Sequence, residues 1–356
     1  MRPIRTPKLL SIFCAIALLS LASCMSEPPI AGDDQQNRTA AWEGTEHQLK
    51  TTPGDSLIGR IAIAPNGSVL AVPGYSAGPM VGDTARRQDP YVAIFDIKTG
   101  ELIRKIPGDL WPLEINKSGD LLLTQSRLEL SIYDIATGSK VRTFGEDVRL
   151  ATFMHDGERL LVQKLKGNEF TTIAFELYSA RTGELIKSIE TPARQVWQLT
   201  ITPDDKHVMV KEDLCGDGYL YMWDLETGVK SPAYNVYTFS NRDAASMDGS
   251  IVSMLNWQDH KTEFRESRTG VLLSSVSRAE NNYMPVDISN DHEHYAAIEF
   301  EDYTRFDVNV RRINDGALVK QVATVNDYIL DMRFTPDGSI LAVGLQNAGV
   351  ILYRVK

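Results

Sequence analysis

The chain has 356 residues, a hydrophobic content of 43% and a formal net charge of −10. This hydrophobic content excludes a wholly disordered chain, and the length suffices for two average domains or for one large all-β domain. The acidic balance argues against nucleic-acid binding, which needs a basic face, and against electrostatic docking on anionic lipid.

The first 24 residues have the pattern of an export signal. Three basic residues in MRPIRTPK precede the apolar run LLSIFCAIALLSLA, which is shorter than the ~20 residues of a membrane span. A basic start, a short apolar run and small residues at its end predict a secretory signal peptide over residues 1–23. The ending Leu21-Ala22-Ser23-Cys24 resembles the lipobox of bacterial lipoproteins. That resemblance implies cleavage before Cys24 and attachment of lipid to its sulfur and amine.

Residues 24–40 are expected to form a flexible tether between the lipid and a folded body. The segment is rich in Pro, Gly, Asp, Gln and Asn and has almost nothing to bury. Met25 follows Cys24, so no Asp stands where the sorting rule of enteric lipoproteins favours retention in the inner membrane. The resemblance therefore implies a lipid anchor in the outer membrane, facing the periplasm.

Past the tether, two kinds of turn recur with one period of about 40–50 residues. The first kind joins two apolar-alternating segments and occurs at Pro65-Asn66-Gly67, Lys117-Ser118-Gly119, His155-Asp156-Gly157, Pro203-Asp204-Asp205, Met247-Asp248-Gly249, Asn290-Asp291-His292 and Pro336-Asp337-Gly338. The second kind occurs in DIKTGEL, DIATGSK, SARTGEL, DLETGVK, ESRTGVL and RINDGAL. Gly supplies the positive φ of tight hairpins, and Asp or Asn tolerates it.

This pattern predicts an all-β fold, a seven-bladed β-propeller of four-stranded blades over residues 41–356. Seven turns of the first kind indicate seven blades, but only six turns of the second kind are present. The last blade therefore lacks its fourth strand, and Trp42–Thr51 (WEGTEHQLKT) is available to supply it. Such an N-terminal strand closes the ring without an exposed edge.

Over residues 41–356 the chain resembles the WD-repeat and YVTN/quinoprotein-like propeller superfamily. Gly-His pairs are absent, and Trp-Asp occurs once, at Trp223-Asp224, so the hydrogen-bond network of a typical WD blade is not expected. Blades held by aliphatic packing are expected instead. In architecture the chain also resembles the propeller lipoprotein of the outer-membrane protein assembly machinery, although that family has eight blades.

Candidate partner-binding residues lie where the inner strands begin, because exposed aromatic and Arg side chains are typical of interface hot spots. Trp111 has a structural alternative, namely filling the wedge between two blades. The segment 74–90 is expected to be an irregular loop that either contacts a partner or is a flexible surface loop. The candidates are Trp111, Arg149, Asn241, Tyr283, Asp327, Tyr328 and, in that loop, Arg86 and Arg87.

No residue is assigned to catalysis, to a cofactor or to a metal. Asp291-His292-Glu293-His294 contains metal-ligand residue types, but it falls on a predicted turn and is expected to be a solvated hairpin. The predicted function is a monomeric protein-interaction scaffold in an envelope complex, not an enzyme. The alternative is a periplasmic enzyme or a propeller that binds a sugar or another metabolite.

Overall fold

The computed structural model divides the chain into two units, Met1–Arg38 and Thr39–Lys356. The structure describes residues 44–356 except 52–55, 58–59, 82–83, 127–128, 146, 167–171, 192–195, 215–216, 232–233, 237–243, 257–258, 278–283 and 303–304. The predicted signal peptide, Cys24 and the tether lie outside the described residues. Among the described residues, no helix is long and apolar enough to cross a membrane.

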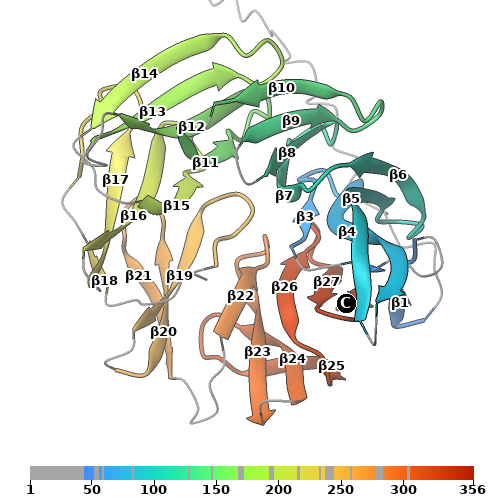
Figure 1. Ribbon diagram of the computed structural model, residues 1–356. Coiled ribbons are helices and arrows are strands. Elements are labelled where there is room, and N and C mark those ends of the chain that lie inside the picture. The colour runs from blue at the N-terminus through green and yellow to red at the C-terminus, as the bar shows by residue number, and fades with distance from the viewer. Residues whose placement is uncertain are drawn as a thin grey trace, which may run out of the picture. The chain divides into compact units, whose positions relative to one another are not determined.

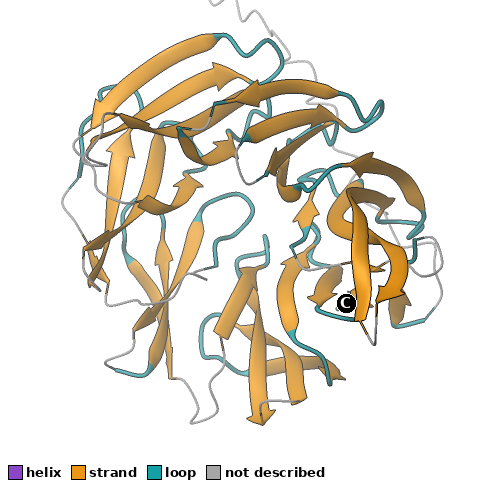
Figure 2. Ribbon diagram, in the orientation of Figure 1, coloured by secondary structure: helices purple, strands orange, loops and turns teal. Residues whose placement is uncertain are grey.

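Residues 44–356 form a seven-bladed β-propeller in which every sheet is antiparallel (Figures 1 and 2). The first three blades consist of β2 (Ser56–Leu57), β3 (Ala62–Ile63), β4 (Val69–Val81), β5 (Thr84–Asp96) and β6 (Leu102–Pro107); β7 (Trp111–Ile115), β8 (Leu121–Gln125), β9 (Leu130–Asp134) and β10 (Lys140–Phe144); and β11 (Val148–Phe153), β12 (Arg159–Lys166), β13 (Thr172–Ser179) and β14 (Leu185–Thr191). The prediction of fold class and blade number is confirmed.

The remaining blades complete the ring. They consist of β15 (Val196–Ile201), β16 (His207–Leu214), β17 (Asp217–Asp224) and β18 (Tyr234–Val236); β19 (Ile251–Asn256), β20 (Lys261–Glu266) and β21 (Leu272–Ser277); β22 (Met284–Ile288), β23 (His294–Asp302), β24 (Arg305–Arg312) and β25 (Leu318–Val325); and β26 (Ile329–Phe334), β27 (Ile340–Leu345), β28 (Gly349–Arg354) and β1 (Glu46–Gln48). In blade 5 the innermost strand position is marked by a single bridge between Ala245 and Val252.

Both series of predicted turns are present in every blade where they were expected. The third residue of each inner turn and the Gly of each outer turn have positive φ. Two of these thirteen positions are not Gly: Asp205 has φ 56° and His292 has φ 59°. Asp tolerates this conformation because its short side chain bonds to nearby backbone, whereas a bulky side chain is normally disfavoured there.

The N-terminal strand closes the ring as predicted. Strand β1 pairs antiparallel with β28, placing His47 opposite Leu352, and the N–H of Leu49 donates to the carbonyl of Val350 at 2.9 Å. Leu49 is itself buried in the apolar cluster between blades 7 and 1. Closure therefore combines a sheet ladder with side-chain packing.

One apolar cluster lies in each of the seven seams between neighbouring blades. The seam between blades 4 and 5 is packed by Met209, Met222, Val252 and Met254. Trp223, of the single Trp-Asp pair, is also buried by packing. The centroid of its ring lies 6.1 Å from that of Phe175 in blade 3. Its indole Nε1 has no hydrogen-bond partner among the described residues. The blades are therefore held by packing rather than by the hydrogen-bond network of a WD repeat.

Hydrogen bonds from outer strands join several blades to the next. Arg104 donates to the carbonyl of Ala136 at 2.6 Å, and Arg142 donates to that of Thr182 at 2.8 Å. In later blades Ser274 donates to Ile313 at 2.6 Å, and Lys320 donates to Arg354 at 3.0 Å. Each of these donors lies four residues after the Gly of an outer turn, and each acceptor belongs to the neighbouring blade.

The expectation of an irregular loop over residues 74–90 is wrong. Strands β4 and β5 continue through this segment as a two-stranded ribbon, with Tyr75 opposite Pro90 and Val81 opposite Thr84. In the sequence two residues, Gly82 and Asp83, separate these strands. Two register shifts absorb the extra residues that hid the alternation in the sequence.

Candidate functional site

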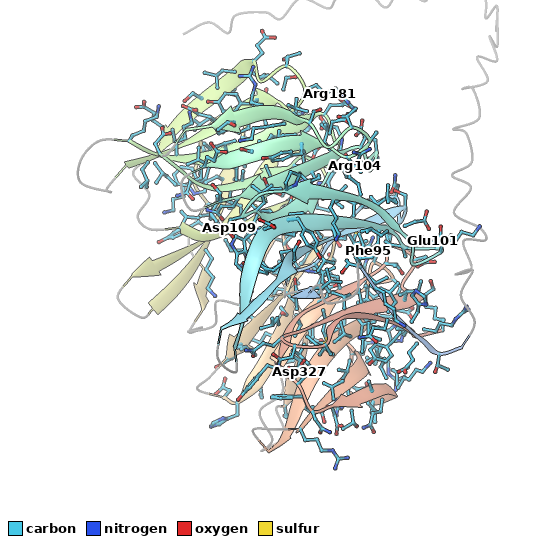
Figure 3. All side chains as sticks on the ribbon, turned by 45° about the vertical axis from the view of Figure 1, so that its right-hand side comes forward. Phe95, Glu101, Arg104, Asp109, Arg181 and Asp327 are labelled. Atoms are coloured by element: carbon cyan, nitrogen blue, oxygen red, sulfur yellow. The ribbon has the colours of Figure 1, made fainter. Side chains whose placement is uncertain are left out.

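The propeller has two opposite faces. The inner and outer turns lie on one of them, here called the turn face, and the inner strands begin on the opposite one, here called the entry face. Figure 3 places Asp109 and Asp327 of the entry face away from Glu101 and Arg181 of the turn face. Partner-binding residues were predicted on the entry face.

Two of the predicted aromatic residues are exposed on the entry face. Trp111 begins β7 and is 39% exposed, so its side chain is not fully enclosed between blades. Tyr328 immediately precedes β26 and is 57% exposed, although its ring rests against Phe306 with the centroids 5.5 Å apart. Both side chains present apolar surface on a rigid support, which is the arrangement that interface hot spots use.

The carboxylate of Asp327 makes hydrogen bonds within its own blade. It accepts hydrogen bonds from the backbone N–H of Asn347 at 2.8 Å, the side-chain amide of Asn347 at 2.9 Å and the N–H of Ala348 at 2.9 Å. These bonds fix the turn between β27 and β28 beside Tyr328. Asp327 therefore positions the entry face, and a direct contact with a partner stays a prediction.

The other predicted residues are only partly covered by the structure. Arg149 lies on β11, and Arg86 and Arg87 lie on β5, but their side chains are outside the described part of the chain. Asn241 and Tyr283 lie outside the described residues altogether. The structure therefore places Trp111, Asp327 and Tyr328 on one face, and the partner-binding role of every predicted residue stays a prediction.

Three carboxylates on inner strands cap backbone N–H groups of the next blade. Glu114 accepts from the N–H of Phe153 at 2.8 Å, Asp287 from that of Phe334 at 2.7 Å, and Asp331 from that of Ile61 at 3.0 Å. The innermost strand of each blade has no further strand to bond its inner edge, so these carboxylates satisfy donors that the sheets leave open. The sequence analysis missed them.

Arg333 compensates the charge of two of these carboxylates. Its guanidinium lies 3.4 Å from Asp287 and 3.5 Å from Asp331. Burial nevertheless raises the pKa of Asp287 to about 7, because Arg333 and the Phe334 N–H offset only part of the desolvation. Burial likewise raises the pKa of Glu114, against the hydrogen bonds from Phe153 and Thr152.

Asp287 is expected to make stability depend on pH near neutrality. Its pKa is about 7 in the folded protein and 3.8 when unperturbed, so between these values the folded state holds a proton that the unfolded state has lost. The free energy of unfolding should therefore fall as pH rises, by up to about 1.4 kcal/mol per pH unit, and level off above pH 7. Urea unfolding of wild type and Asp287→Asn from pH 5 to 8 measures this slope, which the Asn variant should lack.

Asp315→Asn is the matched control for this prediction. The backbone N–H of Ala317 holds the pKa of Asp315 below its ordinary value, so its titration lies outside the measured range. A wild-type slope equal to that of Asp287→Asn would contradict the account of Asp287.

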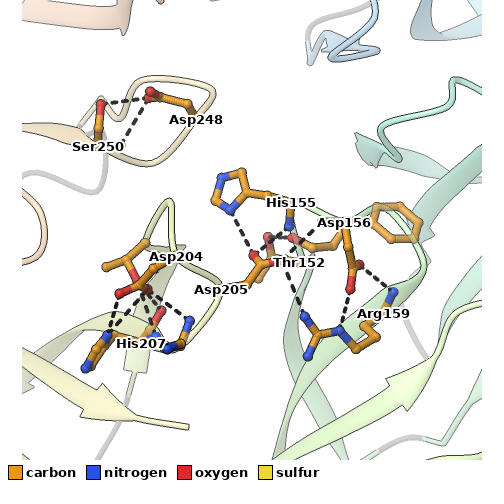
Figure 4. Close-up of polar contacts among 12 residues, drawn as sticks. Thr152, His155, Asp156, Arg159, Asp204, Asp205, His207, Asp248 and Ser250 are labelled. Carbon is orange, nitrogen blue, oxygen red and sulfur yellow. Dashed lines mark hydrogen bonds and ion pairs between the residues drawn. The ribbon is translucent and has the colours of Figure 1, made fainter. Parts of the chain in front are cut away.

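Histidine–aspartate pairs join blades on the turn face, and Figure 4 shows the pair of His155 and Asp205. Asp205 of blade 4 accepts from the backbone N–H of His155 of blade 3 at 2.8 Å and lies 3.0 Å from its ring Nδ1. Burial disfavours the charge of His155, but Asp205 outweighs it and the pKa of His155 is raised. Arg159 joins the cluster through Asp156 and Asp205. The cluster explains why Asp205, despite its positive φ, stands where five of the other blades have Gly.

A similar pair joins blades 5 and 6. The ring Nε2 of His292 lies 2.9 Å from Asp248 and 2.8 Å from the hydroxyl of Ser250. His294 is bound to Asp291 of its own turn at 2.9 Å. The His-containing segment is therefore the inner turn of blade 6, as expected. In the described part of the chain no group of three or more His, Cys, Asp and Glu side chains is arranged to hold a metal ion.

A pocket of about 230 Å³ opens between blades 4 and 5. Asp204 and Glu266 line it together with the exposed Arg268, whose Nε is 3.9 Å from Asp204. The carboxylate of Asp204 also accepts a hydrogen bond from the N–H of Lys206, and it lies 3.3 Å from Nδ1 of His207. Most of the polar contacts described on the turn face therefore join neighbouring blades or residues of one turn.

The chain was compared with known proteins. No model of a protein family matches it, and no curated protein matches it significantly.

Proposed function

We propose that the protein is a lipid-anchored interaction scaffold of the bacterial envelope, held through Cys24 and facing the periplasm. The propeller supplies a rigid support, because seven packed seams and polar contacts between blades fix the loops relative to one another. The anchor and the location rest on the export-signal and lipobox pattern of residues 1–24.

One observation carries the scaffold proposal: Trp111 and Tyr328 are both exposed on the entry face. Trp and Tyr are among the residue types enriched at interface hot spots, and each combines a large apolar ring with a polar group. The polar residues around Tyr328 fix its loop, so that this surface is organised before a partner arrives.

The double variant Trp111→Ala/Tyr328→Ala is expected to lose specific partners without loss of stability. A hot-spot aromatic contributes at least ~2 kcal/mol to binding, so truncating one should weaken binding about thirtyfold and truncating both should weaken it further. The measurement is affinity capture from detergent-solubilised envelopes with tagged full-length protein, quantified by mass spectrometry against wild type.

Ile186→Ala is the matched control. Ile186 is 52% exposed on the outer strand β14, so the variant removes apolar surface from a different part of the molecule. The control should retain the partners that the double variant loses. Equal capture by all three proteins would contradict a partner site on the entry face.

A further inference from the structure

The ribbon formed by β4 and β5 extends beyond its blade. Strand β2 pairs with β4 only as far as Tyr75, and β6 pairs with β5 only from Tyr91 onward. Between these points residues 76–81 and 84–89, as far as the structure describes their neighbours, pair only with each other. An isolated two-stranded ribbon is marginally stable in water, and its unpaired backbone groups form a template for another strand.

The two edges of the ribbon are not equivalent. On β4 a register shift separates Ala77 from Met80, and the intervening Gly78-Pro79 interrupts the edge because Pro has no N–H to donate. On β5 no Pro occurs from Thr84 to Asp89. The β5 edge also continues directly from the edge that β6 occupies, so an added strand would extend an existing sheet.

The register shows which backbone groups face this free edge. The carbonyl of Pro90 accepts from the N–H of Gly108 at 2.7 Å, so the polar groups of Pro90 face the β6 side. The next pairs along the ladder are Gln88 with Ser76 and Arg87 with Ala77. Because successive antiparallel pairs alternate, Gln88 faces β4 and Arg87 faces the free edge. Asp89, with φ 42°, is the bulged residue that resets this alternation.

The charge of this edge points to an acidic occupant. Arg86 and Arg87 are adjacent on β5 in a chain whose net charge is −10. Adjacent positive charges on an edge oppose pairing with a second copy of the same ribbon, which would place like charges opposite each other. They favour a strand that carries Asp or Glu at the matching positions.

We propose that the free edge of β5, residues 84–89, binds an extended acidic segment of a protein partner as an added strand. The inference rests on the proposed scaffold function and gives it a second contact, separate from Trp111 and Tyr328. Backbone hydrogen bonds to the free edge supply the affinity, and the arginines select acidic side chains.

Random nine-residue peptides displayed as a library are the probe, selected on the full-length protein and then measured as synthetic peptides by fluorescence anisotropy. Selected peptides should contain several Asp or Glu and bind with a Kd that N-methylation of alternate backbone N–H groups weakens. Binding should also slow amide hydrogen exchange in residues 84–89.

Three substitutions of Arg87 distinguish the contribution of its backbone hydrogen bond to peptide binding from the contribution of its charge. Arg87→Pro removes both the outward N–H and the charge, Arg87→Ala removes only the charge, and Arg87→Glu reverses it. One hydrogen bond contributes about 0.5–1.5 kcal/mol, so the Pro variant should bind about 2- to 10-fold more weakly than the Ala variant. Arg87→Glu should reject acidic peptides and accept their Lys counterparts.

Trp111→Ala/Tyr328→Ala should bind the selected peptides as wild type does, so that failure of the entry-face site and failure of this edge are distinguishable. Recovery of no acidic peptide, equal binding of N-methylated peptides, or equal binding by the Pro and Ala variants would overturn the proposal. So would a dimer in sedimentation velocity that Arg87→Pro dissociates, because the occupant would then be a second copy.

Discussion

Deleting residues 44–49 is expected to destabilise the propeller more than any single substitution. The deletion removes β1 and Leu49, which exposes the outer edge of β28 and opens the apolar cluster between blades 7 and 1. Removing a buried Leu side chain alone costs about 2–5 kcal/mol, and the lost ladder adds to this. Urea unfolding should show a lower midpoint, and size-exclusion chromatography should show aggregates formed through the exposed edge.

Deletion of residues 28–33, six residues from the predicted tether, is the matched control. This segment was predicted to bury almost nothing, so the unfolding midpoint should not change. An unchanged midpoint after deletion of 44–49 would show that the ring does not depend on closure by β1.

Replacing Cys24 by Ala is expected to move the protein from the membrane fraction to the soluble fraction. Each buried CH₂ of an acyl chain contributes about 0.8 kcal/mol to membrane binding, so the predicted lipids provide the whole anchor. The measurement is fractionation of cells expressing the tagged variant, combined with metabolic labelling by radioactive palmitate. Label should be present in wild type and absent from Cys24→Ala.

Cys215→Ala provides the comparison for this experiment. Cys215 lies far from the lipobox in the sequence and is not a predicted lipid acceptor. The variant should keep both its label and its place in the membrane fraction. A labelled, membrane-bound Cys24→Ala protein would contradict the assignment of the anchor.

The sequence was sufficient for the architecture because the turns depend on local chemistry. A Gly stands at a fixed place in each turn, except at Asp205 and His292, and all thirteen of these positions have positive φ. The closing strand followed from the absence of one outer turn. These inferences needed only the order of residues along the chain.

The polar contacts between blades were not predicted, because their partners are far apart in sequence. Glu114 looks like any solvated acid in an alternating segment until the register places it beside Phe153 of the next blade. A charged residue among the apolar positions of an inner strand, as in Val286-Asp287-Ile288, was the available signal. The ribbon over residues 74–90 was missed because Gly, Pro and two bulges obscured its period of two.

Site-specific photocrosslinking at Tyr328 tests the scaffold proposal most directly. A benzophenone amino acid replaces Tyr328 in one protein and Ile186 in another, and both are irradiated in intact cells. The scaffold account predicts a discrete crosslinked protein from position 328 that is absent at position 186. No adduct at position 328, or the same adducts at both positions, would contradict it.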